Sequence, residues 1–318
     1  MVGITNYSQV GGYRQNFGNV TNTKRPQVKQ PATGYTLPKT MLHGKPEKKS
    51  SNLGWWIAGG TVLLGIGAML LKRRMNWNKI KPLAEHIEFK PAQTIDEARA
   101  FAKKNFGIRK FDVDDLEVAN FINNGFSEAT NIAKGKIVLP NVVRSTNKLD
   151  AAAMVRRNLF GDRIMDYNPS EFSGASMKKV FADFESIIGT DNPKLSQYLS
   201  NLKTAYQNGN FAKRVEIYEQ LRAVRLQYRG TGNKYHTLFH ELGHMQHEWQ
   251  NTNLFLQSCK PFASEAEKKI AGKVSSYAKE DGAEFVAEVF ADLMSGKTYS
   301  DDVMQLYAKY GGPKIGVI

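Results

Sequence analysis

Residues 232–251 constrain the fold of this chain more than any other stretch. Their apolar side chains recur every three or four positions, the period of an α-helix with one buried face; they are Tyr235, Leu238, Phe239, Leu242, Met245 and Trp249. On the neighbouring face, His240 and His244 lie one turn apart. The stretch therefore predicts a helix that packs against a core along one side and presents two imidazoles along the next.

The motif His-Glu-Leu-Gly-His within this helix is suited to metal binding. Two imidazoles at positions i and i+4 reach one ion from a single rigid helix, and Glu241 then lies beside the ion rather than among its ligands. Four of the six histidines fall between residues 236 and 247, which composition alone rarely produces. The alternative is a surface helix whose histidines face solvent, with Glu241 in an ion pair.

A catalytic zinc ion takes three protein ligands and leaves a fourth position to water, so a third ligand is needed. Cys259 is the only cysteine, which excludes a cysteine-based zinc site. His247 follows too soon on the same helix to complete a tetrahedron, and we expect it to support a ligand or to lie on the surface. The metzincin spacing also fails, because Gln250 stands where that pattern has its third histidine. We therefore expect an acidic third ligand downstream.

The segment 275–297 offers two candidates, Glu284 and Glu288, one helical turn apart. One glutamate can bind the metal while the other orients a ligand histidine. We favour Glu284 as the ligand and keep Glu288 as the alternative. A structural role competes with ligation, because Asp281 followed three residues later by Glu284 resembles a helix-capping arrangement that uses the same carboxylate.

Together these residues resemble the catalytic domain of the anthrax-lethal-factor-like zinc metallopeptidases. The likeness rests on the HELGH motif, on Tyr277, and on the E-F-x-A-E-x-F run that begins seven residues later, and it covers roughly residues 233–296. It implies a zincin-like fold with Zn²⁺ bound by His240, His244 and Glu284. It also implies that Glu241 is the general base and that Tyr277 assists the transition state.

The reaction expected of such a site is hydrolysis of a peptide bond in a peptide or protein substrate. Glu241 would take the proton of a zinc-activated water and pass it to the leaving amine, while Tyr277 donates a hydrogen bond to the oxyanion. A second hypothesis is a membrane-tethered scaffold or binding module with a structural or vestigial zinc site, although a structural site has no need of Glu241. A third, raised by the resemblance alone, is a toxin-like effector.

The positive charge of the chain is concentrated at its N-terminal end. The whole chain has 44 basic and 30 acidic residues, whereas residues 1–92 have 14 basic and 3 acidic ones. The remainder is nearly balanced, so we expect no nucleic-acid partner. Residues 1–52 are polar and without helix or strand period, which predicts a disordered basic tail, and they lack the pattern of a cleaved secretory signal.

The run from residue 53 to residue 71 carries no charge over nineteen residues. At about 1.5 Å per residue it spans nearly the ~30 Å core of a bilayer. Trp55 and Trp56 at one end and basic residues 72–74 at the other are typical of membrane interfaces. We therefore expect a single-pass membrane protein with a linker at 72–92, and the flanking charges favour a cytoplasmic C-terminal domain. A buried core helix is the alternative.

From residue 93 onward the pattern becomes globular. Residues 94–107 predict a helix that opens on a Thr cap and closes on Gly107, and further helices are expected around 112–135, 174–189, 194–208 and 211–228. The best strand candidate is 136–143, placed at a sheet edge because Pro140 cannot donate to a ladder.

The fold class that we expect is α+β, mainly α, with a small sheet in the zincin manner. Residues 231–318 would form the zinc-binding catalytic lobe, in which the motif helix and the Glu284 helix face each other across a cleft. Residues 93–230 would form a mainly helical upper lobe of the peptidase or an accessory module. The sequence leaves the oligomeric state open.

Overall fold

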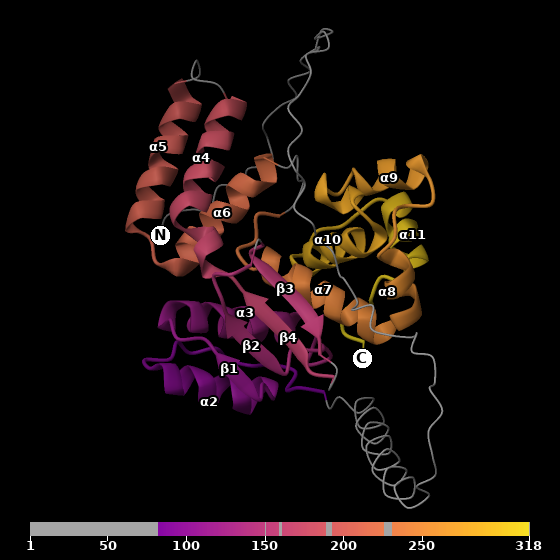
Figure 1. The fold of residues 1–318 in the computed structure, drawn as a ribbon, viewed down its shortest axis with the longest axis horizontal. Helices are drawn as coiled ribbons and strands as arrows, with labels where there is room; N and C mark the ends of the chain where they lie inside the picture. The colour runs from indigo at the N-terminus through magenta and orange to yellow at the C-terminus, as the bar shows by residue number, and fades with distance from the viewer. Residues whose placement is uncertain (1–81, 150, 159–160, 189–192, 226–230, 318) are drawn as a thin grey trace, which may run out of the picture. The chain divides into compact units, whose positions relative to one another are not determined.

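The computed structural model describes residues 82–149, 151–158, 161–188, 193–225 and 231–317 (Figure 1). Within these residues the fold is α+β and mainly helical, with one four-stranded mixed sheet. The expected class is therefore confirmed at the level of secondary structure. All of the described residues belong to one compact unit.

The order of the strands determines what lies next to the motif helix. The sheet has the order β1 (Lys110–Asp112), β2 (Val142–Ser145), β4 (Arg163–Tyr167) and β3 (Ala153–Arg157). Neighbours are parallel except for β3, which runs antiparallel to β4. Within the described residues β3 is thus an edge strand, and it packs against α7 (His236–Gln250) (Figure 1).

Alternate residues of a strand point to the same side of a sheet, and in this sheet the residues on one side are apolar. The row of paired residues that crosses all four strands is buried and consists of Phe111, Val143, Met165 and Val155. The opposite face carries Asp166, which is paired with Arg144 and Arg156 from the two neighbouring strands. The apolar row fixes which side of β3 faces the protein core.

The structure differs from the strand expected at the sheet edge at 136–143. Only Val142 and Val143 belong to a strand, and that strand, β2, is internal rather than at an edge. Residues 137–139 are buried but lie in a connection before it. Pro140 precedes the ladder and never has to donate a hydrogen bond there, so its presence did not indicate an edge.

The two N-terminal helices lie where the sequence predicts them. α2 (Ile95–Phe106) begins at Thr94, whose side chain accepts from the backbone of Glu97, and ends at Gly107 in the left-handed conformation. α3 (Leu116–Ile132) is capped by Asp115. The expected helices at 94–107 and within 112–135 are confirmed.

A group of three helices follows the sheet after a short 3₁₀ turn, η1 (Pro169–Phe172). α4 (Gly174–Ile188), α5 (Pro193–Asn208) and α6 (Phe211–Arg225) match the three helices expected in this part of the chain. α6 packs against α4 and α3, and it reaches the start of α7 through a side-chain contact. There Glu219 accepts hydrogen bonds from both the backbone and the hydroxyl of Thr237, which satisfies a free N–H at the helix terminus.

The C-terminal region is built around α7 and α10 (Gly282–Met294), which pack closely against each other (Figure 1). Gly243 permits this approach, because a Cβ atom there would lie 3.1 Å from Cα of Ala287. The remaining elements of this region are α8 (Thr252–Ser258), α9 (Glu265–Ala271), η2 (Tyr277–Lys279) and α11 (Asp301–Lys309).

The main hydrophobic cluster includes residues on both sides of position 230. Phe121 of α3 lies against Tyr235 with ring centroids 5.0 Å apart, and Phe239 and Leu242 of α7 join the same cluster. A second, smaller cluster lies between α10 and α11 and contains Phe285 among others. The helices and sheet of the 93–230 region therefore supply part of the packing around α7.

Three predicted features lie wholly or largely outside the described residues. They are the disordered tail at 1–52, the transmembrane helix at 53–71 and most of the linker at 72–92. Among the residues that are described, no helix has the length and apolar character needed to cross a bilayer.

Candidate metal centre

Helix α7 brings together the ring nitrogens of the two motif histidines. The Nε2 atoms of His240 and His244 are 3.1 Å apart, and each side chain is only 8% exposed. They are buried because α7 packs against β3 and against α10. The alternative of solvent-facing histidines on a surface helix does not hold for these two residues.

Glu284 completes a triangle of ligand atoms. Its Oε2 atom lies 3.0 Å from Nε2 of His240 and 3.4 Å from Nε2 of His244. Zinc bonds of about 2.0–2.1 Å in a tetrahedron place neighbouring ligand atoms about 3.3 Å apart. The three sides of the triangle, at 3.0, 3.1 and 3.4 Å, are close to that spacing. The donor set is therefore of the kind and size that fits a zinc ion.

The capping alternative for Glu284 is resolved by Asp281. Oδ1 of Asp281 accepts from the backbone N–H groups of Ala283 and Glu284, at 2.9 and 2.8 Å, and so caps α10 itself. The carboxylate of Glu284 contacts the two histidines instead. Capping and the predicted ligation thus use different side chains.

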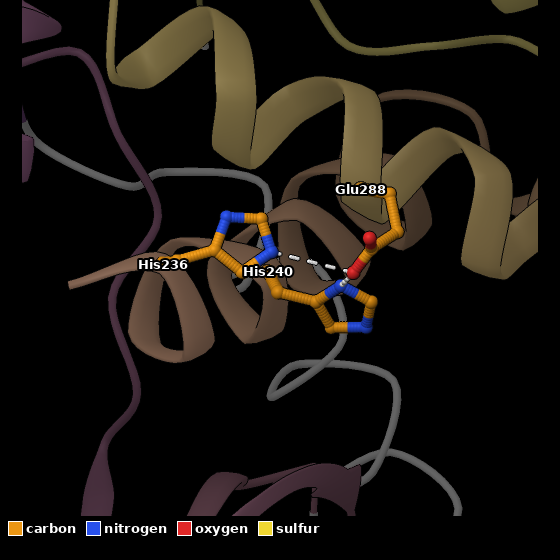
Figure 2. Close-up of side chains that lie close together, drawn as sticks. All are labelled: His236, His240 and Glu288. Atoms are coloured by element: carbon orange, nitrogen blue, oxygen red, sulfur yellow. Dashed lines mark hydrogen bonds and ion pairs between the residues drawn. The ribbon is translucent and has the colours of Figure 1, made fainter. Parts of the chain in front are cut away.

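Glu288 contacts the other side of the His240 ring. Its Oε1 atom lies 2.9 Å from Nδ1 of His240, and the side chain is completely buried (Figure 2). The two atoms are close enough for an ion pair but do not form a hydrogen bond of standard geometry. A carboxylate that holds one ring nitrogen leaves the lone pair of the other free for a metal. Glu284 thus contacts Nε2 of both motif histidines, whereas Glu288 contacts Nδ1 of His240.

The charges of the triangle favour a cation. Burial by itself lowers the pKa of His240, but the contacts with Glu284 and Glu288 raise it to about 10. Burial likewise raises the pKa of Glu284, yet attraction and hydrogen bonds from His244 and His240 hold it well below its usual range. The two carboxylates therefore favour positive charge at His240, and a divalent ion can supply that charge in place of a proton.

Glu241 points from α7 toward the edge strand. Its Oε2 atom accepts a hydrogen bond of 2.8 Å from the backbone N–H of Val155 in β3. Burial raises the pKa of Glu241, and the neighbouring histidines His244 and His240 offset part of that rise. A carboxylate whose pKa is raised is a stronger base, which suits proton transfer near neutral pH.

Tyr277 lies beside the triangle. Its ring centroid is 5.8 Å from that of His240. Burial, followed by the negative charges of Glu284 and Glu241, raises the pKa of its phenol far above the ordinary value. The hydroxyl therefore keeps its proton and remains a hydrogen-bond donor.

His247 belongs to the scaffold rather than to the site. It is fully buried, so a surface position is excluded, and its Nε2 atom donates to the carbonyl oxygen of Tyr310 at 2.7 Å. Burial lowers the pKa of His247 to about 4, so the ring is neutral at physiological pH. It joins the C-terminal segment to α7.

Sequence reasoning missed two residues that adjoin the centre. His236 contacts Glu288 at 3.3 Å, and Arg222 of α6 lies 4.0 Å from the same carboxylate oxygen. A signal for His236 was present, because it stands one turn before His240 in the run of histidines. No local signal identifies Arg222, since only tertiary packing brings α6 to this place.

In the described part of the chain, two groups of three side chains are close enough to hold an ion. One is the triangle of His240, His244 and Glu284, and the other consists of His236, His240 and Glu288. Comparison with protein-family models, with curated proteins and with solved structures finds no match. The functional assignment therefore rests on the geometry and chemistry of these residues.

Proposed function

We propose that this chain is a zinc-dependent metallopeptidase with His240, His244 and Glu284 as its metal ligands. The observation that carries the proposal is the ligand triangle, whose sides match tetrahedral zinc, next to a buried carboxylate at Glu241 that lies outside it. Three protein ligands leave one zinc position for water, which is the pattern of catalytic sites.

Different residues would perform the separate steps of hydrolysis. Bound zinc supplies a Lewis acid that polarises a carbonyl and makes a water molecule easier to deprotonate. Glu241 accepts the proton of the attacking water at its carboxylate and then delivers it to the leaving amine nitrogen. Tyr277 donates its phenol hydrogen to the carbonyl oxygen as negative charge develops there.

Strand β3 is the element that we assign to substrate binding, in place of the segment 136–143. It is an edge strand within the described residues, and Val155 ties it directly to the base Glu241. An extended peptide that pairs with this edge at the residues flanking Val155, whose N–H already donates to Glu241, would lie along the strand and beside the metal centre. The substrate class proposed is therefore a peptide or an unfolded protein segment.

A non-catalytic binding module with a structural or vestigial zinc ion is the second candidate. Structural zinc is nearly always held by four protein ligands, whereas the triangle offers three. A structural ion also gives no reason to bury Glu241 beside it with a raised pKa. These two features favour catalysis.

The run at 53–71 lies outside the described residues, and its membrane role stays a proposal from the sequence. With it, the protein would be a membrane-anchored peptidase whose catalytic domain faces the cytoplasm. The nearly balanced charge of residues 93–318 gives no reason to add nucleic acid as a partner.

Metal content and peptide cleavage of the purified chain test the proposal together. We expect about one zinc per wild-type chain, because one triangle is complete. Glu241→Gln should keep the zinc but lower cleavage of a peptide library by roughly 10²–10⁴-fold, because only the base is lost. The Glu284→Ala variant should lose both the bound zinc and the cleavage activity. Cleavage at the wild-type rate by Glu241→Gln would refute the assignment of the base, and a metal-free wild type would refute the function.

A further inference from the structure

Two helices face each other through a ladder of histidines and acids. On α7 three histidines follow one another at single-turn spacing, and on α10 three acids do the same; they are His236, His240 and His244 opposite Asp292, Glu288 and Glu284. Each histidine contacts at least one acid, at distances from 2.9 to 3.7 Å. The proposed ligand triangle uses one end of this ladder, and His236 lies at the other end.

The second group, His236, His240 and Glu288, differs in kind from the ligand triangle. In the triangle, the three ligand atoms are nearly equally spaced about a common point. In the second group, both ring nitrogens approach the carboxylate oxygen itself, at 3.3 Å and 2.9 Å (Figure 2). A cation is already near, because Arg222 lies 4.0 Å from that oxygen. The arrangement is that of a carboxylate supported by two imidazoles and a guanidinium rather than that of a second ion site.

Glu288 depends on this support because its other oxygen does not anchor it. Among the described residues, Oε2 of Glu288 is buried without a hydrogen-bond partner. The direction of the carboxylate is thus set through Oε1, which two histidines share. Without His236, Oε1 of Glu288 keeps only its contacts with His240 and, at 4.0 Å, with Arg222, so the carboxylate can rotate away from Nδ1 of His240 more easily.

His236 is itself held from its opposite side. Its Nδ1 atom lies 3.7 Å from Oδ1 of Asp292, and the ring is 1% exposed. Asp292 is in turn fixed by Lys297 at 2.7 Å and by the hydroxyl of Tyr299. Contacts on the Asp292 side therefore help to position the His236 ring independently of Glu288.

We propose that His236 is a positioning residue of the metal centre. It donates from Nε2 to Glu288, which keeps the His240 ring oriented so that its Nε2 lone pair faces Glu284 and His244. The inference rests on the proposed metal centre and adds a residue that touches neither the metal nor the substrate. Residues of this kind, one step behind a ligand, typically change metal affinity by 10–100-fold when they are replaced.

The test compares two amides at position 236 in the full-length chain. In His236→Gln the side-chain amide reaches the position of Nε2 and can donate to Glu288, whereas in His236→Asn it reaches only the position of Nδ1. We expect His236→Asn to bind zinc 10–100-fold more weakly than wild type, and His236→Gln to stay within about threefold of wild type. Zinc affinity is measured by competition with a chromophoric chelator.

Two further measurements separate positioning from a merely structural role. With Co²⁺ in place of zinc, the visible absorption bands should change in His236→Asn and not in His236→Gln, because they report ligand orientation. His247→Asn is the matched control, since it removes another buried imidazole of α7 that does not contact Glu288, and it should keep wild-type zinc affinity. If His236→Asn does not fold, His236→Leu replaces it in the same comparison.

Equal zinc affinity in wild type and His236→Asn would overturn this inference while leaving the proposed function intact. Equal weakening in the Gln and Asn variants would also overturn it, because it would show a need for the imidazole volume rather than for the Nε2 donor. A wild-type chain that binds no zinc would instead overturn the metal centre itself.

Discussion

At the scale of single residues, two histidines of α7 differ in charge. The surroundings of His240 favour its protonated form, whereas those of His247 favour its neutral form. His240 and Glu284 form a contact that favours positive charge at the ring. His247, on the same helix, is buried against a carbonyl group and has its pKa lowered to about 4. Two histidines within two turns of one helix thus have opposite responses to acid, because only one of them has carboxylates beside it.

The stability of the metal-free protein should fall as acid is added, in part through His247. An unfolded histidine takes up a proton near pH 6.5, whereas the folded one does so only near pH 4. Between these values the unfolded state binds more protons, so the free energy of unfolding decreases as pH falls, by up to about 3 kcal/mol at the lower end.

Urea unfolding of wild type and His247→Gln in the presence of chelator, between pH 7 and pH 4, measures this effect. The variant cannot titrate at this position, and the difference between the two proteins should shrink as pH falls. A difference that is constant across the range would contradict the assignment.

At the scale of elements, the site depends on how closely α7 and α10 approach. The ligand triangle takes two atoms from one helix and one from the other. Gly243 lies at their contact and leaves no room for a methyl group without displacement of Ala287 or Phe290. The close spacing of the two helices therefore depends on Gly243, which has no side chain to take part in metal binding or catalysis.

Gly243→Ala should destabilise the protein by about 1–3 kcal/mol through overpacking. At an ordinary helix position, Gly→Ala raises the free energy of unfolding by up to about 1 kcal/mol. The sign of the change at position 243 therefore distinguishes a tight helix contact from an ordinary helix position. Guanidinium unfolding of both proteins without metal gives the value. An increase in stability would show that the two helices can separate at no cost.

Helices were easier to predict from this sequence than strands for physical reasons. α2 has a side-chain cap at Thr94 and a terminating glycine at Gly107, which are local signals. The strands have three to five residues each, too few for an alternating pattern to stand out. In β4 nearly every residue is buried, and this includes Asp166, which is paired with two arginines that only tertiary structure brings near.

The closeness of the candidate site residues could largely be predicted, because these residues lie at helical spacing within two segments. The structure brings His240, Glu241, His244, Glu284 and Tyr277 together. The link from Glu241 to Val155 could not be predicted, since it joins residues far apart in the chain through a strand that the sequence did not reveal.

At the scale of the whole molecule, the chain combines a nearly neutral region with a basic N-terminal third that contains the uncharged run 53–71. If this run spans a bilayer, the full-length chain should sediment with membranes and resist extraction by alkaline carbonate. Deletion of residues 1–71 should release a soluble protein that still binds zinc. Extraction of the full-length chain by carbonate would contradict the predicted span.

The ligand triangle also has a mechanical consequence. His244 and Glu284 are about 40 residues apart in sequence, so an ion shared between them is a reversible cross-link that closes a long loop of chain. Such a cross-link restricts the unfolded chain if it survives unfolding and adds its binding free energy to the folded state if it does not. Stripping the ion with chelator should therefore lower the melting temperature of wild type and leave that of Glu284→Ala unchanged, as calorimetry would show. A bound ion would then also hold α7 and α10 together.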